Sequence, residues 1–145
     1  MFNPVSEVKV LFSMFGEDFP LEEIPKALGI KPTETYQTGD VISDKIAEEP
    51  KYHKETVWNM GTGYEKSYDV KEQLDKVLKP LLNKKEEIIG IKKKYGIECR
   101  ILIFVIIEKG EAPAMYLEKE YIDFVSLIGA EIQWDLYANP YVSDF

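Results

Sequence analysis

Two segments of this chain, residues 5–37 and 97–137, repeat one pattern, and this repeat constrains the fold more than any other feature. Each segment begins with alternating apolar and polar residues, continues into a helical stretch that ends in Leu-Gly or Ile-Gly, and closes with a second extended stretch. Alternation with a period of two is typical of β-strands, and glycine commonly ends a helix. The repeat therefore predicts two βαβ-like segments in one fold.

Three strand patterns predict which side chains point inward. Residues 8–14 alternate apolar and polar side chains, which predicts a first strand with one wet face. Residues 97–107 are apolar at alternate positions and, in their second half, on both faces, as expected for a central strand. In the last strand, Ile132, Trp134 and Leu136 alternate with polar residues. We therefore predict that Trp134 lies in the core.

Shorter patterns supply further elements. Extended pieces are predicted at residues 33–37 and 56–60, with a polar loop between them, and a short strand is predicted at residues 114–117. A two-turn helix is predicted after Pro20, and a longer helix at residues 119–128.

The basic middle of the chain predicts a pair of helices. Asp69 and Asn83 each precede a glutamate three residues later and then an apolar pattern, which is the capping signature of a helix start. Pro80 separates the two helices. Together the elements predict an α+β fold, a two-layer sandwich in which helices cover one face of a mainly antiparallel sheet and part of the other face is wet.

Length and composition place limits on the class of protein. A chain of 145 residues, 45% hydrophobic and 30% charged, predicts that residues 1–145 form a single globular domain. The first residues lack the pattern of a secretion signal, and the longest apolar run, residues 101–107, is far too short to span a bilayer. A lone cysteine suits a reducing compartment. We therefore expect a cytoplasmic protein that does not associate with membranes.

The net charge of −8 is unevenly distributed along the chain. Residues 1–55 carry 11 acids and 6 bases, residues 56–107 carry 7 and 10, and residues 108–145 carry 8 and 2. Both βαβ-like segments lie in acidic parts of the chain, and the connection between them is basic. Such a charge balance repels the phosphates of nucleic acid and attracts basic proteins. Nucleic acid is therefore not an expected partner.

Residues from most of the chain also resemble a known family. The relevant pieces are the alternating first strand, EEIPKALGIKPTETYQTGD at residues 22–40, Trp58, the helical pair after Asp69, and YIDFVSLIGAEIQWDLY at residues 121–137. In these pieces the chain resembles domain-of-unknown-function family 4279, a group of small, mostly bacterial proteins. The resemblance implies a free-standing single domain. It carries no established activity and assigns no catalytic residue.

The sequence contains few of the residue patterns that are typical of active sites. His53 is the only histidine and Cys99 the only cysteine, so one chain cannot build a zinc site from several such ligands. No phosphate-binding loop, calcium loop or nucleophile elbow occurs, and no cofactor is expected. Cys99 shares its strand parity with Ile101 and Ile103, which predicts a buried and unreactive thiol. The sequence therefore favours a protein that is not an enzyme.

The favoured function is a non-catalytic protein-binding module whose acidic surface holds a basic partner, as an immunity-type inhibitor holds a basic toxin. Two groups of candidate residues could form that surface. The first is a loop group, Asp40, Asp44, Glu48 and Glu49, which leads to Trp58; the second is the polar face of the last strand, Glu131, Gln133, Asp135 and Tyr137. For Trp58 a core position is favoured over a contact site.

One alternative function and one oligomeric state remain open. The alternative is a small-ligand-binding protein or enzyme that uses a cleft beside the loop at residues 39–55. The sequence also leaves open a homodimer formed by pairing of edge strands.

Overall fold

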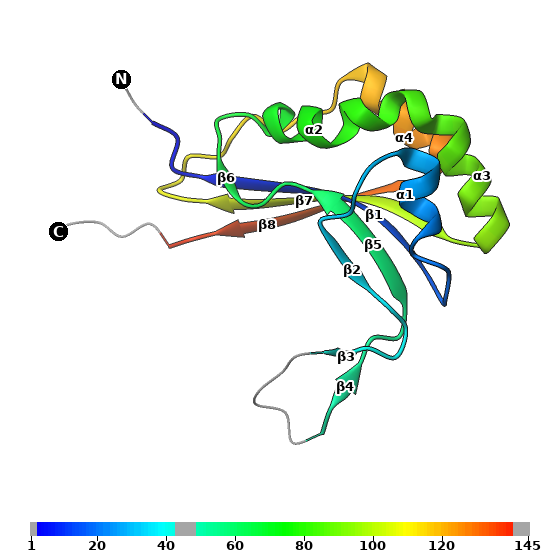
Figure 1. Ribbon diagram of the computed structural model, residues 1–145. Helices are drawn as coiled ribbons and strands as arrows, with labels where there is room; N and C mark the ends of the chain where they lie inside the picture. Colours follow the sequence, from blue (N-terminus) through cyan, green and yellow to red (C-terminus); the bar gives the residue numbers. More distant parts are fainter. Residues whose placement is uncertain (1–2, 43–48, 141–145) are drawn as a thin grey trace.

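The main structural feature is a six-stranded sheet, seen in a computed structural model that describes residues 3–42 and 49–140. Five strands follow one another across the sheet, and a sixth pairs with the N-terminal end of the central strand (Figure 1). In sheet order the strands are β2 (Glu34–Tyr36), β5 (Thr56–Gly61), β1 (Glu7–Gly16), β7 (Glu98–Ile107) and β8 (Glu131–Ala138), with β6 (Glu65–Lys66) beside β1.

The helices lie together on one face of this sheet (Figure 1). They are α1 (Glu23–Leu28), α2 (Val70–Leu78), the 3-10 helix η1 (Lys79–Lys84), α3 (Lys85–Tyr95) and α4 (Lys119–Ile128). All strand pairs of the main sheet are antiparallel except β7 with β8. The predicted α+β class, with helices on one face of a mainly antiparallel sheet, is confirmed. No helix in the described part of the chain is long and apolar enough to cross a membrane.

The two repeated segments form related but unequal units. In the second, α4 connects β7 to β8, and these strands are parallel neighbours. In the first, α1 connects β1 to β2, but β5 lies between them and is antiparallel to both. Strands β1 and β2 therefore point the same way without pairing. The βαβ order is present twice, and the first copy is split by an inserted strand.

The core lies between the sheet and the helices. Val8, Val10, Phe12 and Met14 alternate along β1 and are fully buried, as the first strand pattern predicts. The helix-facing side of β7 also carries Cys99, which is 2% exposed. Burial of such large apolar side chains is the main favourable term in folding.

Helix ends follow local signals in some places and not in others. The Asp69 carboxylate accepts a hydrogen bond of 2.9 Å from the backbone N–H of Lys71, which confirms it as the cap of α2. The predicted cap at Asn83 is wrong. Pro80 lies in the first turn of the 3-10 helix η1, which includes Asn83, and α3 begins after Lys84 without a side-chain cap.

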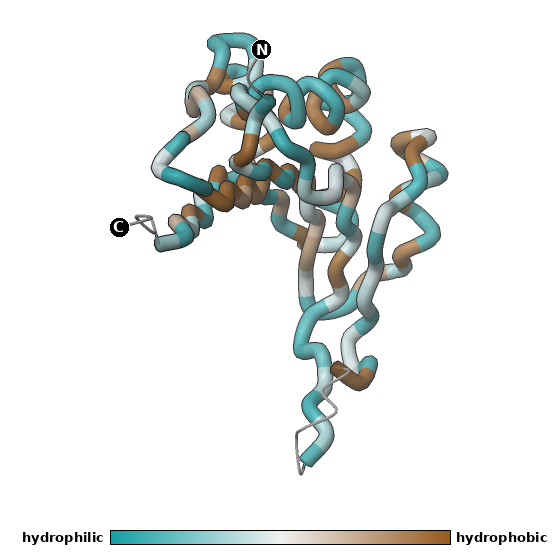
Figure 2. Tube along the Cα trace, turned by 90° about the vertical axis from the view of Figure 1, so that its left-hand side faces the viewer, coloured by the Kyte–Doolittle hydropathy of each residue, from teal (hydrophilic) through white to brown (hydrophobic). Residues whose placement is uncertain are grey.

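The loop at residues 39–55 contains more structure than predicted. Strands β3 (Val41–Ile42) and β4 (Lys51–Tyr52) form a two-stranded hairpin that extends away from the main sheet (Figures 1 and 2). By contrast, the predicted strand at residues 114–117 is reduced to one isolated bridge between Asp69 and Ala114.

The prediction that Trp134 lies in the core is wrong. Its parity is as predicted, because Trp134 is in register with the buried Ile103 and so shares the helix-facing side of the sheet. However, Trp134 is 38% exposed and Leu136 is 51% exposed. The reason is position, since β8 is the last strand of the sheet and pairs only with β7 within the described residues.

Candidate functional site: the open face of the sheet

The side of the sheet that faces away from the helices, here called the open face, has an apolar centre. Side chains alternate along a strand, so residues between the helix-facing positions belong to this face. The partly exposed apolar members are Phe15 of β1, Val57 of β5, and Leu102, Phe104 and Ile106 of β7. A partly exposed group of large apolar side chains on a sheet is typical of a contact surface.

A row of polar residues crosses this apolar surface. The register places Glu34, Asn59, Ser13, Arg100 and Glu131 side by side on five successive strands. At the usual spacing of neighbouring strands the row spans roughly 19 Å. Ser13 Oγ, Asn59 Oδ1 and Arg100 Nε are buried and have no hydrogen-bond partner within the described residues. Buried polar atoms are normally paired, so these three atoms are an exception in the described part of the chain.

Arg100 stands out in this row because it is the only arginine in the sequence. Its guanidinium lies 4.3 Å from the centroid of the Phe15 ring, a cation–π contact that fixes its orientation. Lys9, farther along the same face, is held in a similar way, 5.4 Å from the Tyr64 ring and 5.5 Å from the Phe104 ring. Neither cation forms an ion pair with another described residue.

The predicted acidic group of the last strand forms one rim of the open face. Glu131, Gln133, Asp135 and Tyr137 all lie on this side of β8 and are exposed. Gln133 donates a hydrogen bond of 3.4 Å to the Glu131 carboxylate, and neither Glu131 nor Asp135 has an ion-pair partner among the described residues. The polar parity predicted for this strand is therefore confirmed.

A hollow of about 340 Å³ runs between the centre and the β8 rim. Its lining includes Arg100, Leu102, Phe104, Gln133, Trp134 and Asp135. The hollow has a cation on one side, a carboxylate on the other and an apolar floor. This arrangement can hold a protruding side chain of a partner.

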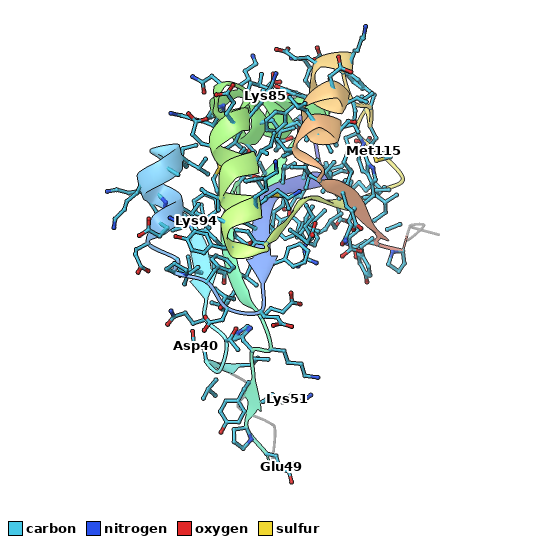
Figure 3. All side chains as sticks on the ribbon, turned by 90° about the vertical axis from the view of Figure 1, so that its right-hand side faces the viewer. Asp40, Glu49, Lys51, Lys85, Lys94 and Met115 are labelled. Carbon is cyan, nitrogen blue, oxygen red and sulfur yellow. The ribbon has the colours of Figure 1, made fainter. Side chains whose placement is uncertain are left out.

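The loop group of acids lies elsewhere. Asp40 and Glu49 are exposed on the hairpin, well away from the helices (Figure 3). The Asp40 carboxylate accepts a hydrogen bond of 2.8 Å from the backbone N–H of Gln37, so it also stabilises the local turn. Asp44 and Glu48 fall outside the described residues. The structure therefore does not join the hairpin acids to the acids of β8.

A larger hollow, of about 650 Å³, lies beside the hairpin where a cleft was predicted. The rings of Tyr36 and His53 stack in its wall, with centroids 4.3 Å apart and an interplanar angle of 23°. The Tyr36 hydroxyl donates a hydrogen bond to the Glu34 carboxylate, and this bond, with burial, raises the pKa of Tyr36. Asp40, Val41 and Ile42 complete the lining. Among the described residues this lining contains carboxylates and aromatic rings but no cysteine or serine nucleophile.

Two other candidates lie in the interior. Trp58 is fully buried, which confirms its core position, so its side chain offers no surface to a partner. Burial raises the pKa of the Cys99 thiol to about 12. His53 lies on the hairpin, away from the strand that carries Cys99, so the two do not form a nucleophile pair (Figure 1). Within the described residues, no three His, Cys, Asp or Glu side chains gather in a way that suits a metal ion.

The polar row on the open face is the feature that sequence reasoning missed. Its signals are present in the chain, because Ser13, Asn59 and Arg100 each interrupt a strongly apolar strand. Only the strand order and register bring the three together. The single arginine was the most informative of these signals.

Comparison with known proteins gives one positive result. No curated protein and no solved structure matched the chain. A family model does match, over residues 6–139, and so covers most of the sequence. The chain therefore belongs to the family described as Domain of unknown function (DUF4279).

Proposed function

We propose that this protein is a non-catalytic binding module that holds a basic protein partner on the open face of its sheet. The observation that carries the proposal is the arrangement of this face, with an apolar and aromatic centre, an arginine that has no ion pair among the described residues, and an acidic rim on β8. Protein interfaces have this anatomy, because aromatic and arginine side chains dominate the desolvated centre and charged groups the rim.

The acidic rim favours a basic partner over an acidic one. Glu131 and Asp135 are exposed, and residues 108–145 as a whole carry 8 acids and 2 bases. Exposed carboxylates steer a basic protein toward the surface and speed association. The more specific form of the proposal is an immunity-type inhibitor, which would cover the basic active site of a toxin.

The experiment begins with capture of a stoichiometric partner from the source cells and then measures association at two ionic strengths. The test variant combines Glu131→Gln with Asp135→Asn. We expect slower association and a flatter salt dependence, because rim charges act mainly on the association rate.

A matched control neutralises the acids of the hairpin instead. The control variant combines Asp40→Asn, Asp44→Asn, Glu48→Gln and Glu49→Gln. If β8 is the rim of the interface, this variant associates at the wild-type rate. Slower association of the control, with no change in the β8 variant, would contradict the proposal and move the interface to the hairpin.

A further variant addresses the centre of the face. Arg100→Lys keeps the positive charge but loses the planar group that stacks on Phe15. We expect faster dissociation with little change in the association rate, because a central contact acts on the lifetime of a complex. An unchanged lifetime would remove Arg100 from the interface.

A second candidate function rests on the hollow beside the hairpin. The stacked Tyr36 and His53 rings and the Glu34 and Asp40 carboxylates suit a small cationic or aromatic ligand. The test is mass spectrometry of small molecules that copurify with the protein, repeated with His53→Ala. A ligand retained by the wild type and lost in this variant would favour the hollow over the open face.

A further inference from the structure

The free edge of β8 has features of an interface that the isolated chain leaves unused. Ile132, Trp134 and Leu136 alternate along one side of this strand as in a buried strand, yet Trp134 is 38% and Leu136 51% exposed. The strand is eight residues long and pairs on one side only within the described residues. A long edge strand with exposed apolar side chains is a template for pairing with another strand.

The direction of the free backbone groups follows from one hydrogen bond. The N–H of Asn139, which continues β8, donates to the carbonyl oxygen of Ile107 in β7 at 2.9 Å. Successive peptide groups of a strand point to opposite sides, so the odd-numbered residues of β8 face β7. The N–H and C=O groups of residues 132, 134 and 136 therefore point outward. These are the groups that a new strand would meet.

We propose that a second copy of this chain pairs with β8 in antiparallel fashion, around a two-fold axis at Trp134. In this register Trp134 lies opposite the partner's Trp134, and Ile132 lies opposite the partner's Leu136. The outward backbone groups of residues 132, 134 and 136 then form hydrogen bonds with the second copy. The apolar side chains exposed in one chain meet those of the other, as in other isologous interfaces.

The charges on the open face select this register over its neighbours. With the axis at Trp134, Glu131 lies opposite the partner's Tyr137 and Gln133 opposite the partner's Asp135, so no carboxylates face each other. An axis at residue 133 places Glu131 opposite the partner's Asp135, and an axis at residue 135 places Asp135 opposite itself. Like charges directly across a strand pair are destabilising. An axis at residue 132 or 136 avoids such pairs but aligns less of the strand.

Pairing would also change the sheet as a whole. The two sheets would join into one, with both open faces on the same side and the acids of both β8 strands at the junction. This inference does not depend on the binding function proposed above. The two differ in salt dependence, because two chains of net charge −8 repel each other and salt screens the repulsion. Self-association should strengthen with salt, whereas binding of a basic partner should weaken.

Sedimentation of the full chain at several concentrations tests the interface. We expect a dimer for the wild type and a monomer for Trp134→Glu, which places two carboxylates on the two-fold axis. Trp134 is partly exposed, so the variant should keep the wild-type circular dichroism spectrum. The matched control is Tyr52→Glu, because Tyr52 is 53% exposed on the hairpin and should leave the dimer intact.

Three outcomes of this measurement would overturn the proposal. They are a wild-type monomer at the highest soluble concentration, a dimer that persists in Trp134→Glu, and a monomer produced by the hairpin control.

Cysteine cross-linking tests the register independently of sedimentation. Residues directly opposite in a hydrogen-bonded pair have Cα atoms about 5.5 Å apart, within the range of a disulfide. Trp134→Cys should therefore cross-link two chains under mild oxidation. Leu136→Cys should not, because its copy in the partner lies roughly 13 Å or more away along the strands. The native Cys99 is 2% exposed and should not interfere. Cross-linking of the Leu136 variant but not the Trp134 variant would overturn this register.

Discussion

The two tryptophans of this protein occupy equivalent sides of the sheet and opposite environments. Trp58 of β5 is in register with Met14, and Trp134 of β8 is in register with Ile103, so both point toward the helix-facing side. Trp58 is fully buried and Trp134 is 38% exposed. The parity of a strand decides the face on which a side chain lies, and the strand order decides whether anything covers it.

The difference comes from what surrounds each ring. Strand β5 lies between β2 and β1, and the ring of Trp58 makes an edge contact with Phe12 at a centroid distance of 6.5 Å. Strand β8 has a neighbour on one side only within the described residues, and the side chain of Trp134 is 38% exposed. A covered position and an edge position should therefore respond differently to the same substitution.

The largest expected effect is at the covered tryptophan. Trp58→Ala should lower the free energy of unfolding by about 3 to 5 kcal/mol, because it removes a large buried ring and leaves a cavity. A denaturant melt measures this loss. Trp58→Phe is the matched control and should cost less, because it keeps most of the volume and removes an indole N–H that has no partner among the described residues. A small loss in the alanine variant would contradict the buried position.

The second prediction uses the reactivity of Cys99 to measure how well the helices shield β7 from solvent. This thiol is 2% exposed, and burial raises its pKa to about 12, so native protein should react with a thiol reagent very slowly. The residual rate should follow the unfolded fraction, which is roughly one molecule in a thousand or fewer. Labelling with and without denaturant gives the ratio. Fast labelling of the native protein would mean that the helices do not cover this part of the sheet.

The third prediction concerns the helical layer that provides this cover. The Asp75 carboxylate of α2 accepts hydrogen bonds from Lys71 Nζ at 2.7 Å and from the hydroxyl of Tyr121 in α4. Burial acts to raise the pKa of Asp75, but these two hydrogen bonds and the positive charges of Lys71 and Lys79 together outweigh it and lower the pKa below the usual range. The ionised carboxylate therefore links α2 to α4. Asp75→Asn should cost about 1 kcal/mol at neutral pH.

The pH dependence of this loss has a definite sign. Because the pKa of Asp75 is lower in the folded chain, its contribution is complete above the unfolded value of about 3.9 and is lost as pH falls through the folded value. The wild type and Asp75→Asn should therefore differ most at neutral pH and converge in acid. Thermal melts at several pH values provide the measurement. A difference that stays constant down to strongly acidic pH would exclude the ionised contact.

Sequence reasoning succeeded where the signal is local. The inward side of residues 8–14, the cap at Asp69 and the glycine that ends α4 are all set by neighbours in the chain, and the structure has each of them. The wet side predicted for residues 8–14 is wrong at Ser13, which is buried. Sequence reasoning failed where contacts between distant segments determine the structure. The cap expected at Asn83 does not form, because Asn83 lies inside the 3-10 helix η1. The row through Ser13 and Arg100 requires the register of five strands, which no local pattern specifies.

The smallest expected effect is at the exposed tryptophan, and it returns to the comparison of the two rings. In dilute solution, where the chain is monomeric, Trp134→Ala should lower the free energy of unfolding by about 1 kcal/mol or less, because the ring is already 38% exposed. The free energy from denaturant melts should therefore fall several times less than for Trp58→Ala. If β8 pairs with a second copy, the wild type gains stability as its concentration rises, since association favours the folded state. Trp134→Ala should lose that concentration dependence while Trp58→Ala keeps it. A loss at Trp134 as large as at Trp58 in dilute protein would mean that the edge strand is covered by its own chain.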